Sequence, residues 1–178
     1  MSKKVLILES SPRKNGNSVM LSEEFAKGAI EAGNTVETIF IKDKNIGYCE
    51  SCYGCVKSGE CVIKDDMAEI LKKMHWADVI VMASPVYFYS LDARMKTLID
   101  RTFCQFHNLK NKEFFYIMTA AQTYDFTMEC TLQCFRNFAR CLENSVERGI
   151  ICANGVYKAG KVANTEFMQQ AYEMGKTV

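Results

Sequence analysis

The sequence predicts an α/β fold in which helices cover both faces of one parallel sheet. Two observations support this prediction. Short apolar, β-branched runs alternate along the chain with longer segments of helical period. The chain has 178 residues, of which 48% are hydrophobic, and this is enough for a core that needs no disulfides or metal. We therefore expect a three-layer α/β sandwich.

Five segments have strand character because they are short, apolar and rich in β-branched residues. In chain order they are Lys4 to Glu9, Val36 to Ile41, Asp78 to Ala83, Phe114 to Thr119 and Val146 to Ala153. Helical segments separate them, which indicates crossover connections and a five-stranded parallel sheet. The expected order is 2-1-3-4-5, so the carboxyl ends of strands one and three flank one crevice.

Five segments have helical period. They are Ser18 to Ala32, a segment that starts after Asp65 or Asp66, Leu91 to Phe106, Thr127 to Asn144, and Thr165 to Lys176. The first is expected to bury Met20, Leu21, Phe25 and Ile30, and the second to bury Met67, Ile70, Leu71 and Met74. A polar, cysteine-bearing insertion from about 43 to 64 precedes the second helix. We expect residues 1–178 to form a single domain with this insertion.

The charge balance argues against several classes of partner. Lys and Arg exceed Asp and Glu by one, and no block of like charges is present, so neither nucleic acid nor an anionic membrane is an expected partner. The apolar run Val5 to Leu8 is too short for a signal peptide or a membrane span. We expect a cytoplasmic protein.

A loop suited to a phosphate follows the first strand. It runs from Ser10 to Ser18 and enters the first helix, where free backbone N–H groups and the positive end of the helix dipole favour an anion. The loop also carries possible side-chain donors, which are Ser11, Arg13, Asn17 and Ser18. The alternative is an ordinary turn with Ser18 as the N-cap. Walker and GxGxxG motifs are absent, which disfavours an ATPase and a dinucleotide fold.

The loop Ser11-Pro12-Arg13-Lys14-Asn15-Gly16-Asn17-Ser18 resembles the first loop of the flavodoxin-like NAD(P)H-dependent FMN reductases, although Ser10 replaces the usual glycine. The resemblance extends through the segments Asp65 to Met67, Ala83 to Phe88 and Asp100-Arg101. It implies a flavodoxin-like sandwich whose first loop binds the FMN phosphate. It also implies that Pro85, Val86, Tyr87 and Phe88 contact the flavin ring, and that the protein is a homodimer or a dimer of dimers.

A second and a third loop are expected at the same crevice. The segment Pro85 to Leu91 is unusually aromatic, and the alternative to a flavin contact is a packing or dimer-contact loop. The loop after the fourth strand contributes Ala120, Ala121 and Tyr124, where relatives usually carry glycines. Tyr124 would cover the ring or lie on the surface.

The resemblance implies an FMN-dependent oxidoreductase with NAD(P)H as cosubstrate. The chemistry would belong to the flavin, so we expect no catalytic acid or base from the protein. Electrons would pass to a small-molecule or ferredoxin-type acceptor. The alternative function is that of a non-catalytic flavodoxin-like electron carrier, although flavodoxins are usually acidic and this chain is nearly neutral.

Four cysteines lie close together in the insertion, and they are Cys49, Cys52, Cys55 and Cys61. Three cysteines at successive two-residue gaps are typical of iron–sulfur ligation, whereas structural zinc favours two separated pairs. The motif resembles that of the iron-sulfur flavoproteins, a branch of the same family, and so implies a 4Fe-4S cluster. There are three alternatives: the cysteines bind zinc, they form a thiol pair, or they are structural and bind no metal. If they bind zinc, the whole protein could be a zinc-binding interaction module. We expect the other cysteines to pack as small hydrophobes, and these are Cys104, Cys130, Cys134, Cys141 and Cys152.

Overall fold

The computed structural model describes residues 2–178, and its centre is a parallel sheet. The parallel strands are β1 (Lys4–Glu9), β2 (Thr35–Phe40), β3 (Val79–Tyr87), β5 (Glu113–Thr119) and β6 (Val146–Ala153). They lie in the order β2-β1-β3-β5-β6, with β4 (Ser90–Leu91) attached to β3. Counted as parallel strands, this is the predicted order 2-1-3-4-5, and the prediction is confirmed.

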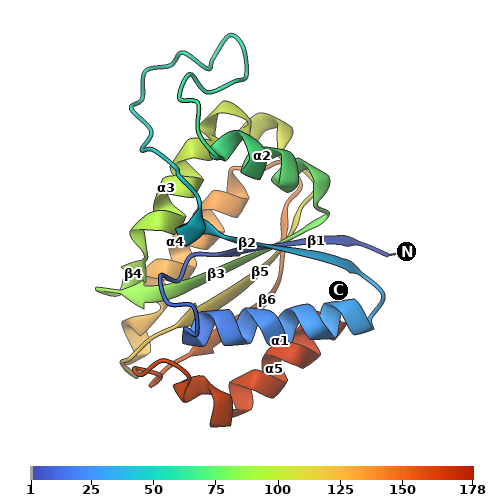
Figure 1. The fold of residues 1–178 in the computed structure, drawn as a ribbon, viewed down its shortest axis with the longest axis vertical. Coiled ribbons are helices and arrows are strands. Elements are labelled where there is room, and N and C mark those ends of the chain that lie inside the picture. The colour runs from blue at the N-terminus through green and yellow to red at the C-terminus, as the bar shows by residue number, and fades with distance from the viewer. Residues whose placement is uncertain (1) are drawn as a thin grey trace.

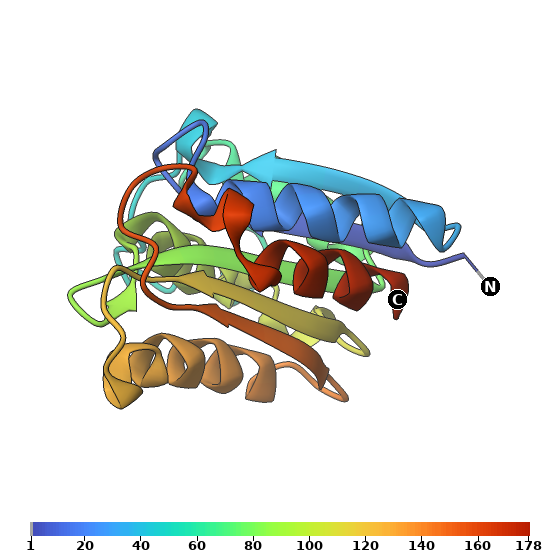
Figure 2. The same cartoon turned by 90° about the horizontal axis from the view of Figure 1, so that it is seen from below.

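Helices cover both faces of the sheet (Figures 1 and 2). One layer contains α1 (Asn17–Glu31) and α5 (Glu166–Lys176), and the other contains α2 (Met67–Trp76), α3 (Ala93–Arg101) and α4 (Glu129–Arg140). Successive residues of a strand point to opposite faces, so β1 contributes to two cores. Val5 and Ile7 pack with Phe25 of α1, while Leu6 and Leu8 belong to the core that includes α2.

The region after β3 differs from the prediction. β3 continues to Tyr87 and turns back through Phe88 and Tyr89 into β4, which forms an antiparallel hairpin with it. Both turn residues have positive φ, 49° and 61°, as a two-residue hairpin turn with the strand twist requires. The predicted start of a helix at Leu91 is therefore wrong: α3 begins after Asp92, whose Oδ1 accepts a hydrogen bond from the Arg94 N–H at 2.9 Å.

Some burial predictions are also wrong. Ile30 is 58% exposed because Ala29, one position earlier on α1, faces the core. Cys130 on α4 and Cys141, which directly follows α4, are exposed, whereas Cys134 on α4 is half-buried and packs against the core. Cys104 and Cys152 are half-buried against that core. Among residues 2–178, the helices are all too short or too polar to cross a lipid bilayer.

Candidate functional site

A cavity of about 130 Å³ lies at the carboxyl ends of the central strands, beside the N-terminus of α1. The loop after β1 provides Ser11, Arg13, Gly16, Asn17 and Ser18. The other walls come from the end of β3, the end of β5 and the loop after β6, and they comprise Pro85, Val86, Tyr87, Thr119, Ala120, Ala121, Val156 and Tyr157. The cavity therefore lies at the point where the strand order reverses, which is the usual ligand position in this architecture.

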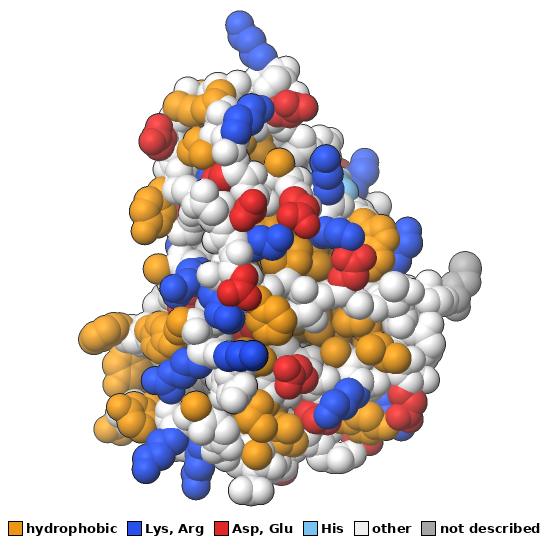
Figure 3. All heavy atoms as spheres, in the orientation of Figure 1, with side chains coloured by type: hydrophobic (Ala, Val, Ile, Leu, Met, Phe, Trp, Pro, Cys, Tyr) orange, Lys and Arg blue, Asp and Glu red, His pale blue; other side chains and the backbone are white. Residues whose placement is uncertain are grey.

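The structure brings most of the predicted binding residues to this one cavity. Phe88 and Tyr124 are the exceptions. Phe88 is fully exposed at the tip of the β3–β4 hairpin, and the half-exposed Tyr124 stacks on Phe126 with ring centroids 5.6 Å apart. These aromatic side chains belong to a surface rather than to the cavity wall, and Figure 3 shows hydrophobic side chains gathered at the hairpin end of the molecule.

The donors at the cavity are mainly backbone groups. The first hydrogen bond of α1 runs from the Met20 N–H to the Gly16 carbonyl at 3.1 Å, so the N–H groups of Asn17, Ser18 and Val19 have no partner within the helix. A Cβ at Gly16 would lie only 2.6 Å from the Ser11 hydroxyl oxygen, and only glycine fits there without a shift. The loop is thus a cradle of N–H groups with Arg13 at its edge, and it fits a phosphomonoester.

Asn17 and Ser18 use their side chains within the protein. The Asn17 amide donates to the carbonyls of Val156 at 2.8 Å and Lys158 at 3.0 Å, and its oxygen accepts from the Val162 N–H. The Ser18 hydroxyl donates to Oε1 of Glu9 at 2.9 Å. The expectation that these two side chains are free phosphate donors is therefore not met. Asn17 instead attaches the loop after β6 to the loop after β1. The loop after β6 adds Val156 and Tyr157 to the cavity wall.

Two carboxyl groups are buried directly behind the loop. Glu9, at the end of β1, has no exposed surface, and Asp92 is nearly as buried. Burial raises the pKa of Glu9 to about 7, against the hydrogen bonds from Ser11, Ser18 and Ser22 that lower it, and the charge of Asp92 raises it further. Burial likewise raises the pKa of Asp92. The sequence contains a local signal for Glu9, because an acidic residue follows the four apolar residues Val5 to Leu8 within a buried strand.

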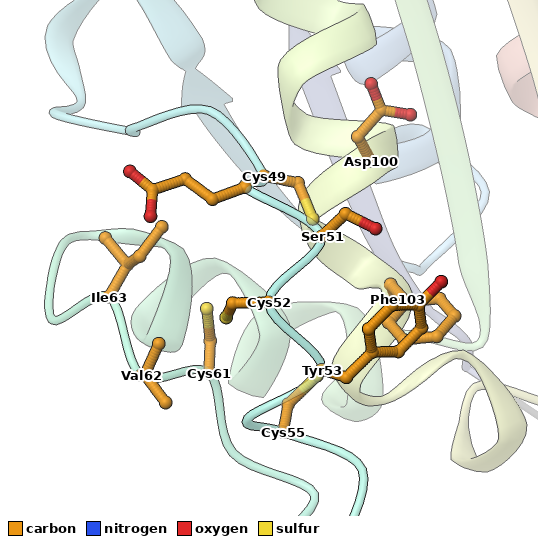
Figure 4. A pocket seen from close by; sticks show the side chains of 11 residues that line it. Cys49, Ser51, Cys52, Tyr53, Cys55, Cys61, Val62, Ile63, Asp100 and Phe103 are labelled. Atoms are coloured by element: carbon orange, nitrogen blue, oxygen red, sulfur yellow. The ribbon is translucent and has the colours of Figure 1, made fainter.

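A second cavity, of about 340 Å³, lies in the cysteine-bearing insertion. All four predicted metal ligands line it, namely Cys49, Cys52, Cys55 and Cys61, together with Phe103 and Asp100 of the neighbouring helical region. The insertion has two arms, and Figure 4 shows Cys49, Cys52 and Cys55 on the first and Cys61 on the second. Cys52 and Cys61 lie on facing sides of the two arms. A fifth thiol lies near them: burial, and then the charges of Cys61 and Cys55, raise the pKa of Cys104.

The donor set of this cavity suits a soft metal centre. Four thiols line it, as iron–sulfur clusters require. Within the part of the chain that the structure describes, no three Cys, His, Asp or Glu side chains converge closely enough to hold a metal ion. The insertion has little regular structure, and Ser51 and Tyr53 have positive φ. The chemistry of the residues fits a cluster, and loading one would require the arms to move together.

Both ends of the insertion are held by a single side chain from α3. The Arg101 guanidinium is buried and donates to the carbonyl of Gly47 at 2.7 Å and to both oxygens of Asp65. Burial opposes the ionisation of Asp65, but hydrogen bonds from Arg101, Gly47 and Met67 hold its pKa below the ordinary value. Arg101 therefore holds Gly47, near the start of the insertion, close to Asp65, which directly follows it.

The chain matches the family model of the NADPH-dependent FMN reductases over residues 3–143. It is 42% identical over 99 residues to an iron-sulfur flavoprotein of Methanocaldococcus jannaschii, which covers 56% of this chain and 51% of the relative. An iron-sulfur flavoprotein of Archaeoglobus fulgidus is also 42% identical, over 91 residues that cover 51% of this chain and 41% of the relative. The chain thus aligns with about half the length of these curated relatives.

Solved structures share the fold at low identity. An NAD(P)H:quinone oxidoreductase from Methanothermobacter marburgensis superimposes with a TM-score of 0.83 at 16% identity, covering 99% of this chain and 96% of the other. An FMN-dependent NADH-azoreductase from Bacillus anthracis, in complex with FMN, has a TM-score of 0.71 at 19% identity and covers 98% of this chain and 96% of its own. These similarities concern the architecture of the sheet and its helices.

Proposed function

The chain belongs to the NADPH-dependent FMN reductase family, and from this premise we propose that it is an FMN-dependent oxidoreductase. It would take a hydride from NAD(P)H and pass electrons to a small-molecule or ferredoxin-type acceptor. We take residues 1–178 as one flavodoxin-like FMN-binding domain with a cysteine-rich insertion. FMN, when bound, supplies the hydride-accepting ring, and the protein contributes binding, orientation and water exclusion.

The observation that carries this proposal is the cavity at the switch point. Its phosphate end is formed by the N–H groups of the first turn of α1, by Ser11 and by Arg13. Its other walls are the end of β3, with Pro85 paired to Thr119 of β5, and Ala120, Ala121 and Tyr157. Paired ends of β3 and β5 hold part of these walls, so they can fix the orientation of a planar ring before a nicotinamide arrives.

Flavin titrations test the binding step. The apoprotein should bind FMN more tightly than riboflavin, which lacks the phosphate, and the difference is measured by flavin fluorescence. Arg13→Ala should weaken FMN binding by about tenfold or more, because it removes a charge-assisted hydrogen bond to the phosphate. The affinity for riboflavin should not change. Lys14→Ala is the matched control, because Lys14 is an adjacent exposed cation outside the cavity wall. Equal affinities for FMN and riboflavin in the unmodified protein would contradict the proposal.

Anaerobic stopped-flow mixing tests the hydride step. The FMN-loaded protein is mixed with NADPH or with NADH, and the bleaching of the flavin absorbance is followed. Reduction by either nucleotide supports the oxidoreductase and ranks the two donors. An unchanged flavin spectrum with both would instead favour the non-catalytic flavodoxin-like carrier, which binds FMN but has no productive nicotinamide position.

We propose further that Cys49, Cys52, Cys55 and Cys61 hold a 4Fe-4S cluster. Four thiols around one cavity support this, as do relatives that carry the name iron-sulfur flavoprotein. When bound, the cluster supplies one-electron transfer to the acceptor. Protein purified without oxygen should contain about four irons and four sulfides per chain. Cys52→Ser should lose most of this iron, whereas Cys130→Ser, an exposed cysteine on α4, should keep it. Zinc without iron would contradict the assignment.

The expected homo-oligomer is the remaining part of the proposal. Support comes from the exposed aromatic side chains at the hairpin end, where Tyr89 packs on Phe126 with ring centroids 5.0 Å apart. Light scattering after size exclusion measures the mass in solution. A monomer at all tested concentrations would contradict this part and leave the flavin chemistry untouched.

A further inference from the structure

The buried carboxyl of Glu9 lies one hydrogen bond away from the phosphate cavity. Its Oε1 accepts from the Ser11 N–H at 2.7 Å and from the Ser18 hydroxyl at 2.9 Å, and both of these residues line the cavity. A second anion, the phosphate of FMN, would bind to the other side of the same loop. Two negative charges on the two sides of one loop repel each other, and the repulsion is strengthened because Glu9 is buried.

The second oxygen of Glu9 shows how this conflict is avoided. Oε2 lies 2.9 Å from the Ser22 hydroxyl oxygen, and that hydroxyl also lies 2.8 Å from the carbonyl oxygen of Ser18. Serine has one hydroxyl proton, so it can donate to only one of these two acceptors. With an ionised Glu9, the Ser22 hydroxyl donates to Oε2, and the Ser18 carbonyl keeps the backbone N–H of Ser22 as its partner within α1. With a proton on Oε2, Glu9 donates to the Ser22 hydroxyl and that hydroxyl donates to the Ser18 carbonyl, so the same side-chain positions also accommodate the neutral acid.

Among residues 2–178, none of the groups that act on Glu9 is a cation that would favour its ionised form. Helix α1 presents the uncharged hydroxyls of Ser18 and Ser22. Asp92, at the start of α3, adds a negative charge, and Asp92 is itself engaged by the hydroxyls of Ser10 and Ser84. Arg13 reaches across to the carbonyl of Tyr157 at 3.4 Å, on the other wall of the cavity. Burial and the charge of Asp92 therefore raise the pKa of Glu9 to about 7, although the hydrogen bonds from Ser11, Ser18 and Ser22 lower it.

Resting on the proposed function, we propose that Glu9 is a positioning residue that takes up one proton from solvent, on Oε2, when the FMN phosphate occupies the loop. The neutral carboxyl keeps the Ser11 N–H and the Ser18 hydroxyl in place and removes the charge that opposes the phosphate. FMN binding is thereby linked to pH. The sign follows from linkage: the complex holds one proton more than the free protein above the pKa of free Glu9, so FMN affinity falls as pH rises.

Glu9→Gln is the decisive variant because glutamine reproduces the protonated acid. Its amide oxygen can accept from Ser11 and Ser18, and its NH₂ group can donate to Ser22. We expect the FMN dissociation constant of the unmodified protein to rise by up to about tenfold per pH unit across part of the range from about pH 7 to 9, as a one-proton linkage requires. Across this range a phosphomonoester is already mostly a dianion, since its second pKa is about 6.

Three comparisons complete the experiment. Glu9→Gln should bind FMN with an affinity independent of pH, riboflavin should show no such dependence with either protein, and Glu23→Gln, an exposed carboxylate on α1, should behave like the unmodified protein. The same pH profile for Glu9→Gln and the unmodified protein would overturn the inference. If neither FMN nor riboflavin binds at any pH, the proposed function itself fails.

Calorimetry keeps the inference testable even if Glu9→Gln does not fold. FMN is titrated into the unmodified apoprotein at about pH 8 in two buffers that differ in ionisation enthalpy, which counts the protons exchanged on binding. We expect an uptake approaching one proton with FMN and none with riboflavin. Binding of FMN without proton uptake would overturn the inference.

Discussion

The guanidinium of Arg101 and the carboxylate of Asp65 form a buried bidentate ion pair, with Nη1 to Oδ2 at 2.6 Å and Nη2 to Oδ1 at 2.9 Å. Asp65 also accepts from the N–H of Gly47, at the start of the insertion, and from that of Met67, at the start of α2. The pair therefore joins α3, α2 and both ends of the cysteine-bearing segment. The pair thus holds the two ends of this segment close together.

Arg101→Met should destabilise the protein by about 3–5 kcal/mol, because it leaves Asp65 as a buried charge without its partner. The free energy of unfolding in urea measures the loss. Lys96→Ala is the matched control: it removes the exposed ion pair with Asp100 on the same helix, and should cost less than about 0.5 kcal/mol. A loss for Arg101→Met no larger than that of the control would contradict the anchoring role.

Asn17→Ala should detach the loop after β6 from the phosphate loop. It removes two donated hydrogen bonds to Val156 and Lys158 and one accepted from Val162, at a cost of about 1–3 kcal/mol for groups left unsatisfied. Because Val156 and Tyr157 line the cavity, FMN affinity should fall as well. Asn15→Ala, at an exposed position of the same loop, should change neither quantity. Denaturation and flavin titration are both needed, and unchanged FMN binding in folded Asn17→Ala would contradict the coupling of the two loops.

Gly28→Ala should weaken the layer formed by α1 and α5. A Cβ at Gly28 would collide with the backbone carbonyl of Tyr172, and one at Gly175 with that of Phe25, so the two glycines permit the close crossing of these helices. Overpacking costs about 1–3 kcal/mol and outweighs the helix propensity of alanine. Gln170→Ala, on the exposed side of α5, should stay within about 0.5 kcal/mol of the parent protein. A stabilised Gly28→Ala variant would show that the helices are farther apart than described.

Phe88→Gly should stabilise the folded protein by about 0.5–1 kcal/mol. The φ of Phe88 is 49°, and this conformation costs a non-glycine residue about 1–2 kcal/mol. Glycine avoids this cost, but its more flexible unfolded chain destabilises the folded state by about 0.5–1 kcal/mol. The side chain is fully exposed, so no packing is lost. Phe88→Ala keeps the positive φ and should leave stability unchanged. If both variants also weaken FMN binding, the hairpin tip contacts the flavin as predicted. Equal stabilities for the two variants would contradict the strain.

The strands, the helices and the loop between β1 and α1 could be predicted because their signals are local. A buried parallel strand such as β1 is a continuous apolar run, and α1 starts where a polar loop meets a helical period. The order of the strands was implied by the resemblance to the flavodoxin-like family, because the general rules for doubly wound sheets allow more than one order. The resemblance of the loop from Ser11 to Ser18 then indicated the family that the comparison identified.

The predictions that were wrong depended on how each segment pairs and packs in the folded chain. Leu91 was expected to begin a helix, but the hairpin at Phe88 and Tyr89 pairs it with Val86 and places it in a strand. Cys130 and Cys141 share the spacing of Cys134, yet they lie outside the part of α4 that the core covers. Spacing alone gives a helix face and not the width of the surface that packs against it.

By itself, the sequence determined the alternation of strands and helices, the polar loop from Ser10 to Ser18 that enters α1, and the four-cysteine motif, since each depends on neighbouring residues. Only the tertiary structure decided three contacts. Asn17 donates to the loop after β6, Arg101 joins the two ends of the insertion, and Glu9 accepts hydrogen bonds from Ser11 and Ser18. The physical reason is that the free energy of a hydrogen bond or an ionised group depends on burial and on partners brought together by folding.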